Sequence, residues 1–340
     1  MDFYVAKIAD KDCRGRAGVL KFKSRSGEGE KVLETPTLVC HSSGGSPPYL
    51  THDLVKDVGL KALHLSYADL ESTATLHNFK SCEGGDHGSL CLFPDVVSIM
   101  SPTSLLQGSL ELSSATHLCV AAMTGRKTVS PQVYMDVAKT IQPDILLALH
   151  DEISYSSGAN RHRKAWTRSL DWLNACSVAL SAGATGCNRN NRQGDKEETE
   201  EVGEEQKSTG KVTYDVDRVV STSCNSEPLR HPALFGVVIG GNDCQARRDC
   251  ATELAAHKDL QGFVIAGIGL GQGREEMRQA LEAATGVLPE GAPRGVTSVS
   301  SPLEVLEVSV GPCCKTQKHL SGMLSNRGQT PSQTFNLLHP

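Results

Sequence analysis

The chain alternates short apolar segments with segments of helical period, and this alternation constrains its fold more than any other feature. The strand-like segments are rich in β-branched residues; they are Thr37–Cys40, Asp144–Leu149, Leu234–Ile239, Gly262–Ile268 and, more weakly, Leu60–Leu65. The amphipathic helical segments are Pro131–Ile141, Lys164–Leu180, Arg247–Ala256 and Glu275–Ala284. The first of them has Ser130 as its predicted N-cap and Pro131 at its first position. Strands that alternate with helices are typical of an α/β fold with parallel strands. A (β/α)8 barrel takes about 250 residues and fits within this chain; a doubly wound sheet is the alternative.

Two stretches do not fit a compact domain. Residues 186–210 are the first, and between Asp195 and Glu205 they hold seven acidic residues and one lysine. Such a run buries little apolar surface, so we predict a disordered acidic insertion. Residues 308–340 are the second; they show no sustained periodicity, and we predict an unrelated, mostly disordered tail. The sequence therefore predicts one folded unit over residues 1–307, interrupted at about 186–210.

Composition excludes several functional classes. The formal net charge is −5, which excludes a globally basic nucleic-acid coat but not a local basic patch. The apolar stretches stay well short of the roughly 18 residues that span a bilayer, and the N-terminus lacks a secretory pattern. We therefore expect no transmembrane segment. The 12 cysteines include no C-x-x-C pair, which favours free thiols in a reducing compartment over a structural zinc site.

Two motifs follow predicted strands, at the end where parallel α/β folds bind their ligands. Asp151 and Glu152 could accept hydrogen bonds from a guanine-like base; alternatively, they cap the next loop or pair with nearby arginines. Gly240 and Gly241 would let the backbone lie against a planar base. From these residues alone, however, a tight turn between strand and helix is the better explanation for the two glycines.

Gly267 begins a glycine-rich loop between a predicted strand and a predicted helix. The dinucleotide pattern G-x-G-x-x-G fails there, because Gln272 stands where its last glycine would be. An α/β dehydrogenase is therefore a disfavoured alternative. The densest basic cluster, which consists of Arg161, Arg163, Lys164 and Arg168, lies near the start of a predicted helix. It could meet phosphates, or it could be a solvated helix face.

In this order, the motifs resemble the tRNA-guanine transglycosylase family from the N-terminus to about residue 306. The most specific stretch is residues 236–277, which reads as strand, Gly-Gly, helix, strand, glycine loop and helix. Further similar stretches are 33–40, 47–55, 124–131, 142–152, 161–176 and 300–307. Within the family, the chain is most similar to the eukaryotic non-catalytic members. The resemblance implies a (β/α)8 TIM barrel; catalytic members exchange guanine at the tRNA wobble position for queuine, through a covalent bond between an aspartate and the ribose.

The resemblance also implies roles for single positions. Where catalytic members have an aspartate before a glycine, this chain has Thr124, which cannot act as a carboxylate. The base-recognising aspartate is retained as Asp151. The glycines that line the base pocket are retained as Gly240 and Gly241, and the glycine loop is retained at Gly267. These four residues are therefore interpreted as relics of a base pocket.

The nucleophile and the zinc site of the family are missing. The nucleophile should follow residues 304–307 closely, yet no aspartate or glutamate occurs after Glu307. The family implies zinc, but only Cys313, Cys314 and His319 follow, at a different spacing, so we expect no zinc ligands in this chain. We also expect a barrel that is incomplete at its last strand and helix, with two unpaired strand edges. The abrupt change indicates a truncated isoform or a misread gene model.

We therefore expect a non-catalytic subunit that forms a heterodimer with a catalytic queuine tRNA-ribosyltransferase subunit and supports tRNA binding. Arg126, Lys127 and the basic cluster at 161–168 are candidate contacts with tRNA or with the partner. The family implies a cytoplasmic location and a peripheral association with the mitochondrial outer membrane. An active transglycosylase and a non-functional truncated product are the alternatives.

Overall fold

The computed structural model describes residues 1–6, 16–23, 29–71, 95–104, 112–154, 157–185, 231–268, 273–299 and 335–339. These residues form a barrel, a three-stranded sheet at the N-terminus and a two-stranded hairpin. The predicted insertion at 186–210 lies outside the described residues, as does most of the predicted tail at 308–340.

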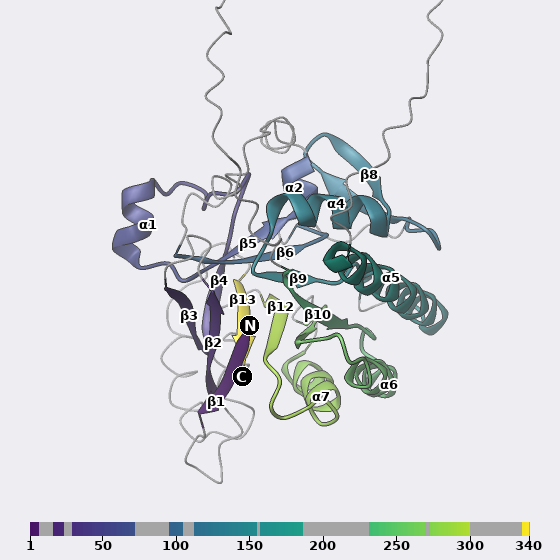
Figure 1. Ribbon diagram of the computed structural model, residues 1–340. Coiled ribbons are helices and arrows are strands. Elements are labelled where there is room, and N and C mark those ends of the chain that lie inside the picture. The colour runs from purple at the N-terminus through teal and green to yellow at the C-terminus, as the bar shows by residue number, and fades with distance from the viewer. Residues whose placement is uncertain are drawn as a thin grey trace, which may run out of the picture.

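Eight strands close into a barrel in the order β10, β11, β12, β13, β4, β5, β6 and β9 (Figure 1). Their bounds are β4 Thr37–His41, β5 Ala62–Ser66, β6 Val97–Ser101, β9 Ile145–Leu147, β10 Ala233–Val238, β11 Gly262–Ile265, β12 Arg294–Val299 and β13 Phe335–His339. Seven of these strands run parallel to their neighbours, whereas β13 is antiparallel to both β12 and β4. The predicted α/β class with parallel strands is confirmed, and the closed sheet differs from the doubly wound alternative.

The barrel is closed at the place where the sequence predicted a missing last strand. β13 lies between β12 and β4, with Leu338 opposite Gly295 and Asn336 opposite Val39. The prediction of an absent strand and two unpaired edges is therefore wrong for this structure, because a strand from residues 335–339 satisfies the backbone groups of both edges. These five residues also depart from the disorder predicted for 308–340. The predicted absence of the last helix concerns residues outside the described ranges.

Besides β13, two further barrel strands were not predicted from the sequence. β6 reads VSIMS and β12 reads RGVTSV, so serine, threonine and glycine interrupt the apolar run on which the prediction relied. A barrel strand has one face toward the interior and one toward the helices, and small polar side chains can be buried on either when they are hydrogen-bonded. Ser98 of β6, which is fully buried, is such a residue.

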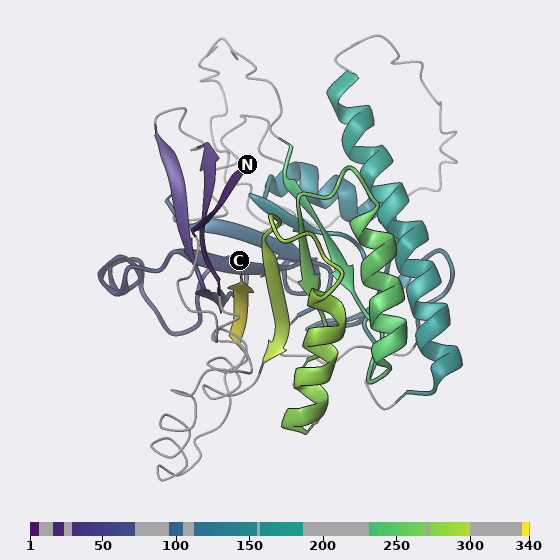
Figure 2. The same ribbon diagram turned by 90° about the horizontal axis from the view of Figure 1, so that it is seen from below.

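The helices cover the outside of the barrel. Their bounds are α1 His52–Val58, α2 Tyr67–Glu71, α4 Pro131–Ile141, α5 Ala159–Thr185, α6 Cys244–Ala255 and α7 Arg274–Thr285. The start of α4 is confirmed: the Ser130 hydroxyl accepts a hydrogen bond from the Val133 N–H, and Pro131 is the first helical residue. Figure 2 shows α5, α6 and α7 side by side on the outer face of the strands.

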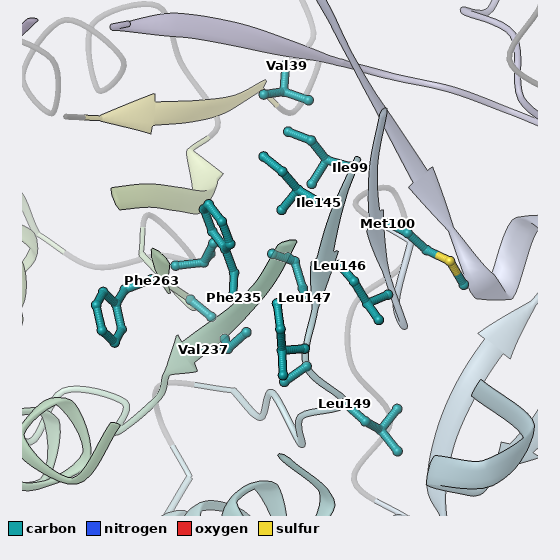
Figure 3. Packing of buried hydrophobic residues seen from close by; sticks show 14 of the residues in the cluster. Val39, Ile99, Met100, Ile145, Leu146, Leu147, Leu149, Phe235, Val237 and Phe263 are labelled. Atoms are coloured by element: carbon teal, nitrogen blue, oxygen red, sulfur yellow. The ribbon is translucent and has the colours of Figure 1, made fainter. Parts of the chain in front are cut away.

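The barrel interior is filled by side chains from facing strands. Figure 3 shows several of them, including Val39, Ile99, Ile145, Leu147 and Phe235. A Cβ atom added at Gly262 would collide with the Phe235 ring. The glycine at the start of β11 therefore leaves the space that the ring on β10 fills, as close packing requires.

A buried ion pair joins the N-terminal sheet to the barrel. The sheet consists of β1 Asp2–Ala6, β2 Ala17–Lys23 and β3 Glu30–Thr35, all antiparallel. Lys31 faces inward from β3, and its Nζ lies 3.0 Å from Oδ2 of Asp144, just before β9; the two side chains are 2% and 1% exposed. The N–H and hydroxyl of Ser98 also donate to this oxygen. The carboxylate is thus neutralised and hydrogen-bonded, which a buried charge requires.

Replacing Lys31 by methionine leaves the Asp144 carboxylate buried without its counter-charge. We expect K31M to lower the free energy of unfolding by about 3–5 kcal/mol, measured by urea denaturation.

Lys21→Met is the matched control, because Lys21 lies on the neighbouring strand and pairs with Glu30 at 3.4 Å, with both side chains exposed (41% and 54%). An exposed pair contributes about 0–1 kcal/mol. Equal losses in the two variants would contradict the structural role of the buried pair.

Candidate functional site

The predicted site residues meet at the carboxyl ends of β9, β10, β11 and β12, the end at which parallel barrels place their active sites. Residues 148–152 follow β9, residues 239–243 follow β10, residues 266–268 follow β11, and Ser298 lies near the end of β12. Asp151, Gly240, Gly241 and Gly267 all lie in these segments, so the structure brings the four predicted pocket residues to one end of the barrel.

Asp151 is fully buried and is paired with two arginines of α5. Its Oδ2 lies 2.8 Å from Nη1 of Arg161 and 2.9 Å from Nη1 of Arg168. Its backbone N–H donates to the Ser169 hydroxyl at 2.9 Å. The sequence left several interpretations of Asp151 open, and in the structure its carboxylate pairs with nearby arginines. The carboxylate already receives charged donors and has no free oxygen turned to solvent.

Arg168 and Trp172 connect α5 to the loop before the hairpin. Arg168 also donates to the Ser113 carbonyl oxygen at 2.7 Å, and the Trp172 indole N–H donates to Ala115 at 2.8 Å. The side chains of Arg161 and Arg168 are only 21% and 17% exposed. Their role in this structure is to bind Asp151 and this loop, so they are poorly placed to meet a phosphate.

The predicted basic cluster therefore divides into two sets. Arg161 and Arg168 are seven residues apart and share the inner face of α5. Arg163 and Lys164 are exposed on other faces of the helix, and Arg163 donates to the Asn160 side chain at 2.5 Å. The other two predicted basic contacts lie on the hairpin strand β8 Gly125–Val129, where Arg126 is exposed and Lys127 is partly exposed.

Gly240 and Gly241 lie against protein side chains. Both have positive φ, at 155° and 60°. A Cβ atom at Gly240 would lie 2.7 Å from Cγ of Arg247, and one at Gly241 would collide with the ring of His162. For this pair the sequence offered a tight turn or a close approach to a planar base. In the structure the Asp243 N–H donates to the Gly240 carbonyl oxygen at 3.2 Å within the turn, and a buried arginine and a buried histidine lie against the two glycines.

Arg247 connects the ends of two strands. Asp243 caps α6 by accepting from the N–H groups of Gln245 and Ala246, so the helix begins at Cys244 and turns Arg247 inward in its first turn. The guanidinium is fully buried; Nε donates to Gly241 O at 2.7 Å and Nη1 to Ala266 O at 3.1 Å. Burial lowers the pKa of Arg247 to about 10, so the group stays charged at neutral pH.

Glu152 faces this guanidinium from the end of β9. Its Oε1 accepts from the Ser298 hydroxyl at 3.2 Å, and its Oε2 lies 3.8 Å from Nε2 of His150. A Cβ atom at Gly267 would lie 3.7 Å from Oε1 of Glu152 and 3.8 Å from Nη2 of Arg247. Burial alone would raise the pKa of Glu152, but the contacts with His150, Ser298 and the Gly267 backbone outweigh it and hold the pKa below its ordinary value.

Ser298 reaches Glu152 through an irregularity in β12. The pairing of β12 with β13 shifts register between Val296 and Val299, and Ser298 has a φ of 68° there. Bulges commonly redirect a side chain in this way. Ser298, Arg247, His150 and His162 were not predicted as members of the site. His150 and His162 adjoin the predicted residues Asp151 and Arg161, but no local pattern shows which way they face, and Arg247 and Ser298 reach the site from other parts of the chain.

Thr124 lies apart from these strand ends. With Met123 it forms the turn between β7 Leu118–Ala122 and β8, and both residues are exposed. The hairpin is a two-stranded sheet separate from the barrel. The resemblance matches Thr124 to an aspartate of the catalytic members, but a threonine supplies no carboxylate at this turn.

A second polar group lies at the ends of β4 and β5 and was also missed. It contains the buried side chains His41, His64 and Asp69. Burial, and then the nearby His41, lower the pKa of His64 to about 3, and burial raises the pKa of Asp69. Among the described residues, no group of three or more His, Cys, Asp or Glu side chains could hold a metal ion. The described residues therefore include no set of side chains that could bind zinc. Cys313, Cys314 and His319 lie outside the described residues.

The chain matches known proteins along most of its length. The family model for queuine tRNA-ribosyltransferase matches residues 11–200 and 195–311. Queuine tRNA-ribosyltransferase accessory subunit 2 of Xenopus tropicalis is 26% identical over 315 residues, which is 90% of this chain and 63% of that protein. The proteins of the same name from Gallus gallus and Homo sapiens are 25% and 24% identical, over 86% and 84% of this chain. The chain spans 59% and 60% of the length of those two relatives.

None of the helices in the described ranges combines the length and the apolar character needed to cross a lipid bilayer.

Removing the buried guanidinium should collapse the mouth of the barrel. We expect Arg247→Met to lower the free energy of unfolding by about 3–5 kcal/mol, because it leaves Glu152 and two buried carbonyl oxygens without their donor or counter-charge. Chemical denaturation followed by circular dichroism measures the loss.

Arg248→Met is the control, since this neighbouring side chain is exposed and a surface change of this kind stays within about 0.5 kcal/mol. Similar losses in R247M and R248M would show that the buried network does not hold the strand ends.

Proposed function

Because the chain belongs to the queuine tRNA-ribosyltransferase family, we propose that it is the non-catalytic accessory subunit of such an enzyme. The assembled enzyme would exchange guanine for queuine at the wobble position of tRNA, with this chain supporting the catalytic subunit and the binding of tRNA. The names of relatives that match most of this chain, all accessory subunit 2, support this proposal over that of an active transglycosylase.

The observation that carries the proposal is that the chain's own side chains occupy the predicted base pocket. The His162 ring lies against Gly241, Arg247 lies against Gly240, and two arginines hold Asp151. A base could enter only by displacing buried, hydrogen-bonded groups, and an uncompensated buried charge is costly. A pocket filled by the protein's own side chains is consistent with a subunit that has the barrel fold but does not bind a base.

The chemistry of the exchange points the same way. A carboxylate must attack the ribose as guanine leaves and must itself leave when queuine arrives. At the described carboxyl ends of β9 to β12, Asp151 is bound by Arg161 and Arg168, and Glu152 by Ser298. No aspartate or glutamate follows Glu307 in the sequence. The proposal therefore assigns no nucleophile to this chain and leaves that role to the catalytic subunit.

The same proposal covers the finer architecture, the metal and the location. We interpret the fold as the family's (β/α)8 TIM barrel, in which residues 1–307 supply seven of the eight barrel strands and β13, from residues 335–339, takes the position of the eighth. It assigns no zinc to this chain, because Cys313, Cys314 and His319 do not reproduce the spacing of the family's ligands. It places the protein in the cytoplasm, with peripheral association at the mitochondrial outer membrane.

For contacts with tRNA or with the catalytic subunit, the proposal favours the outward-facing basic residues. Arg163 and Lys164 on α5 and Arg126 on β8 are exposed, so their charges can reach phosphates without breaking an internal ion pair. Arg161 and Arg168 are already engaged with Asp151 and are assigned to positioning instead.

An exchange assay tests the proposed role directly. We expect the purified chain to incorporate no labelled guanine into tRNA on its own, since both carboxylates at the described ends of β9 to β12 are already bound by other side chains. A mixture with a catalytic family member should incorporate guanine and should elute from a sizing column as a complex. Incorporation that grows with the concentration of this chain alone would contradict the proposal.

Charge reversal tests the basic surface. In the complex with the catalytic subunit, R163E/K164E should weaken tRNA binding and reduce the slope of log K against log salt by about 1 for each phosphate that the variant no longer neutralises. The control K56E/K139E changes the charge equally at exposed lysines of α1 and α4. Unchanged affinity for both tRNA and the catalytic subunit in R163E/K164E would remove this surface from the proposal.

A further inference from the structure

Two polar atoms in the core of the barrel have no partner among the described residues. They are Nδ1 of His64 on β5 and the hydroxyl of Thr297 on β12. The two residues are only 1% and 8% exposed. Buried polar atoms are nearly always hydrogen-bonded, either to protein or to an ordered water molecule, so this pair requires an explanation.

Both residues line the same cavity inside the barrel. The cavity has a volume of about 20 Å³, enough for one water molecule. The rest of its lining is backbone and apolar side chains, among them Ile99, Leu147 and Phe235, whose arrangement is visible in Figure 3. Within the described part of the chain, His64 and Thr297 are therefore the only polar side chains that line this cavity.

The hydrogen bonds on the other side of His64 fix its tautomer. The Ser101 hydroxyl lies 2.8 Å from the Thr103 carbonyl oxygen and 2.7 Å from Nε2 of His64. A carbonyl oxygen can only accept, so the single hydroxyl proton of Ser101 goes to Thr103, and Nε2 of His64 must donate to Ser101. Burial and the nearby His41 lower the pKa of His64 to about 3, so the ring carries one proton at neutral pH. Nδ1 is therefore an acceptor without a partner among the described residues, on a side chain that lines the cavity.

We propose that the barrel core binds one water molecule, which donates a hydrogen bond to Nδ1 of His64 and accepts one from the Thr297 hydroxyl. One molecule has the complementary donor and acceptor for both atoms, and the cavity has room for it. The bound water links β5 to β12 across the interior, so two strands that are not neighbours in the barrel share a polar contact. This inference is independent of the proposed function, since it concerns the core beneath the barrel mouth.

Thr297→Val distinguishes a hydrated cavity from a dry one. Valine keeps the shape of the side chain and removes only the hydroxyl. If the water is bound, T297V removes one of its partners, and we expect the melting temperature to fall by about 2–4 °C. If the cavity is dry, T297V removes an unsatisfied group, and the melting temperature stays the same or rises; that result would overturn the proposal.

Thr35→Val calibrates the size of the loss. Thr35 is also buried, and its hydroxyl donates to the Gly18 carbonyl oxygen at 3.2 Å. If a water molecule bridges the Thr297 hydroxyl, T297V and T35V should both lower the melting temperature, by amounts of the same order. A shift in T35V with none in T297V would count against the water.

Two measurements on the unaltered protein keep the test independent of how the variants fold. Nitrogen NMR of His64 should show a protonated Nε2 and an unprotonated Nδ1, and the ring should show a nuclear Overhauser effect with a long-lived water. A crystal structure should show density for one ordered water molecule within hydrogen-bond distance of both Nδ1 of His64 and the Thr297 hydroxyl. A cavity without such density would overturn the proposal.

Discussion

The guanidinium of Arg247 is the group on which the mouth of the barrel depends. It has no contact with water, yet it stays charged, so it needs the carbonyl oxygens at the ends of β10 and β11 and the nearby carboxylate of Glu152. These requirements hold three strand ends in one arrangement. They also explain one glycine, because a side chain at Gly240 would collide with Arg247. Gly267 is favoured instead by its positive φ of 68°.

A second buried charge at the barrel mouth is also neutralised by side chains of the protein. Asp151 is buried between Arg161 and Arg168, and Arg168 extends the contact to the loop at Ser113. Together the two networks bind the buried arginine and carboxylate side chains at the ends of β9, β10 and β11 to other groups of the protein. The positions at which the family resemblance implies a base pocket are thus still present, but they hold the barrel together. This is the physical basis on which an accessory role is proposed for the chain.

At the opposite end of the strands, the Lys31–Asp144 pair attaches the N-terminal sheet beside the starts of β6 and β9. Between the two ends, β13 supplies the eighth strand of the barrel from a stretch whose sequence lacks any periodic signal. β13 runs antiparallel to both neighbours, yet it still provides hydrogen-bond partners for the backbone groups at the edges of β12 and β4.

Several features followed from the sequence alone, because they depend on neighbouring residues. The alternation of apolar and amphipathic segments predicted an α/β fold with parallel strands, and Ser130 with Pro131 predicted the start of α4. The Gly240–Gly241 pair favoured a tight turn between a strand and a helix, and it lies in the short connection between β10 and α6.

Only the tertiary structure decided which side chains lie against these two glycines and how the barrel closes. His162 and Arg247 occupy the space beside the glycines, Ser298 reaches Glu152 from a bulge in β12, and β13 pairs with β4 across almost the whole length of the chain. The serines of β6 and β12 hid two strands because their burial depends on partners in other strands. Local patterns specify helices and strands, whereas the partner of a buried charge or an unpaired edge is set by which distant segments the closed sheet brings together.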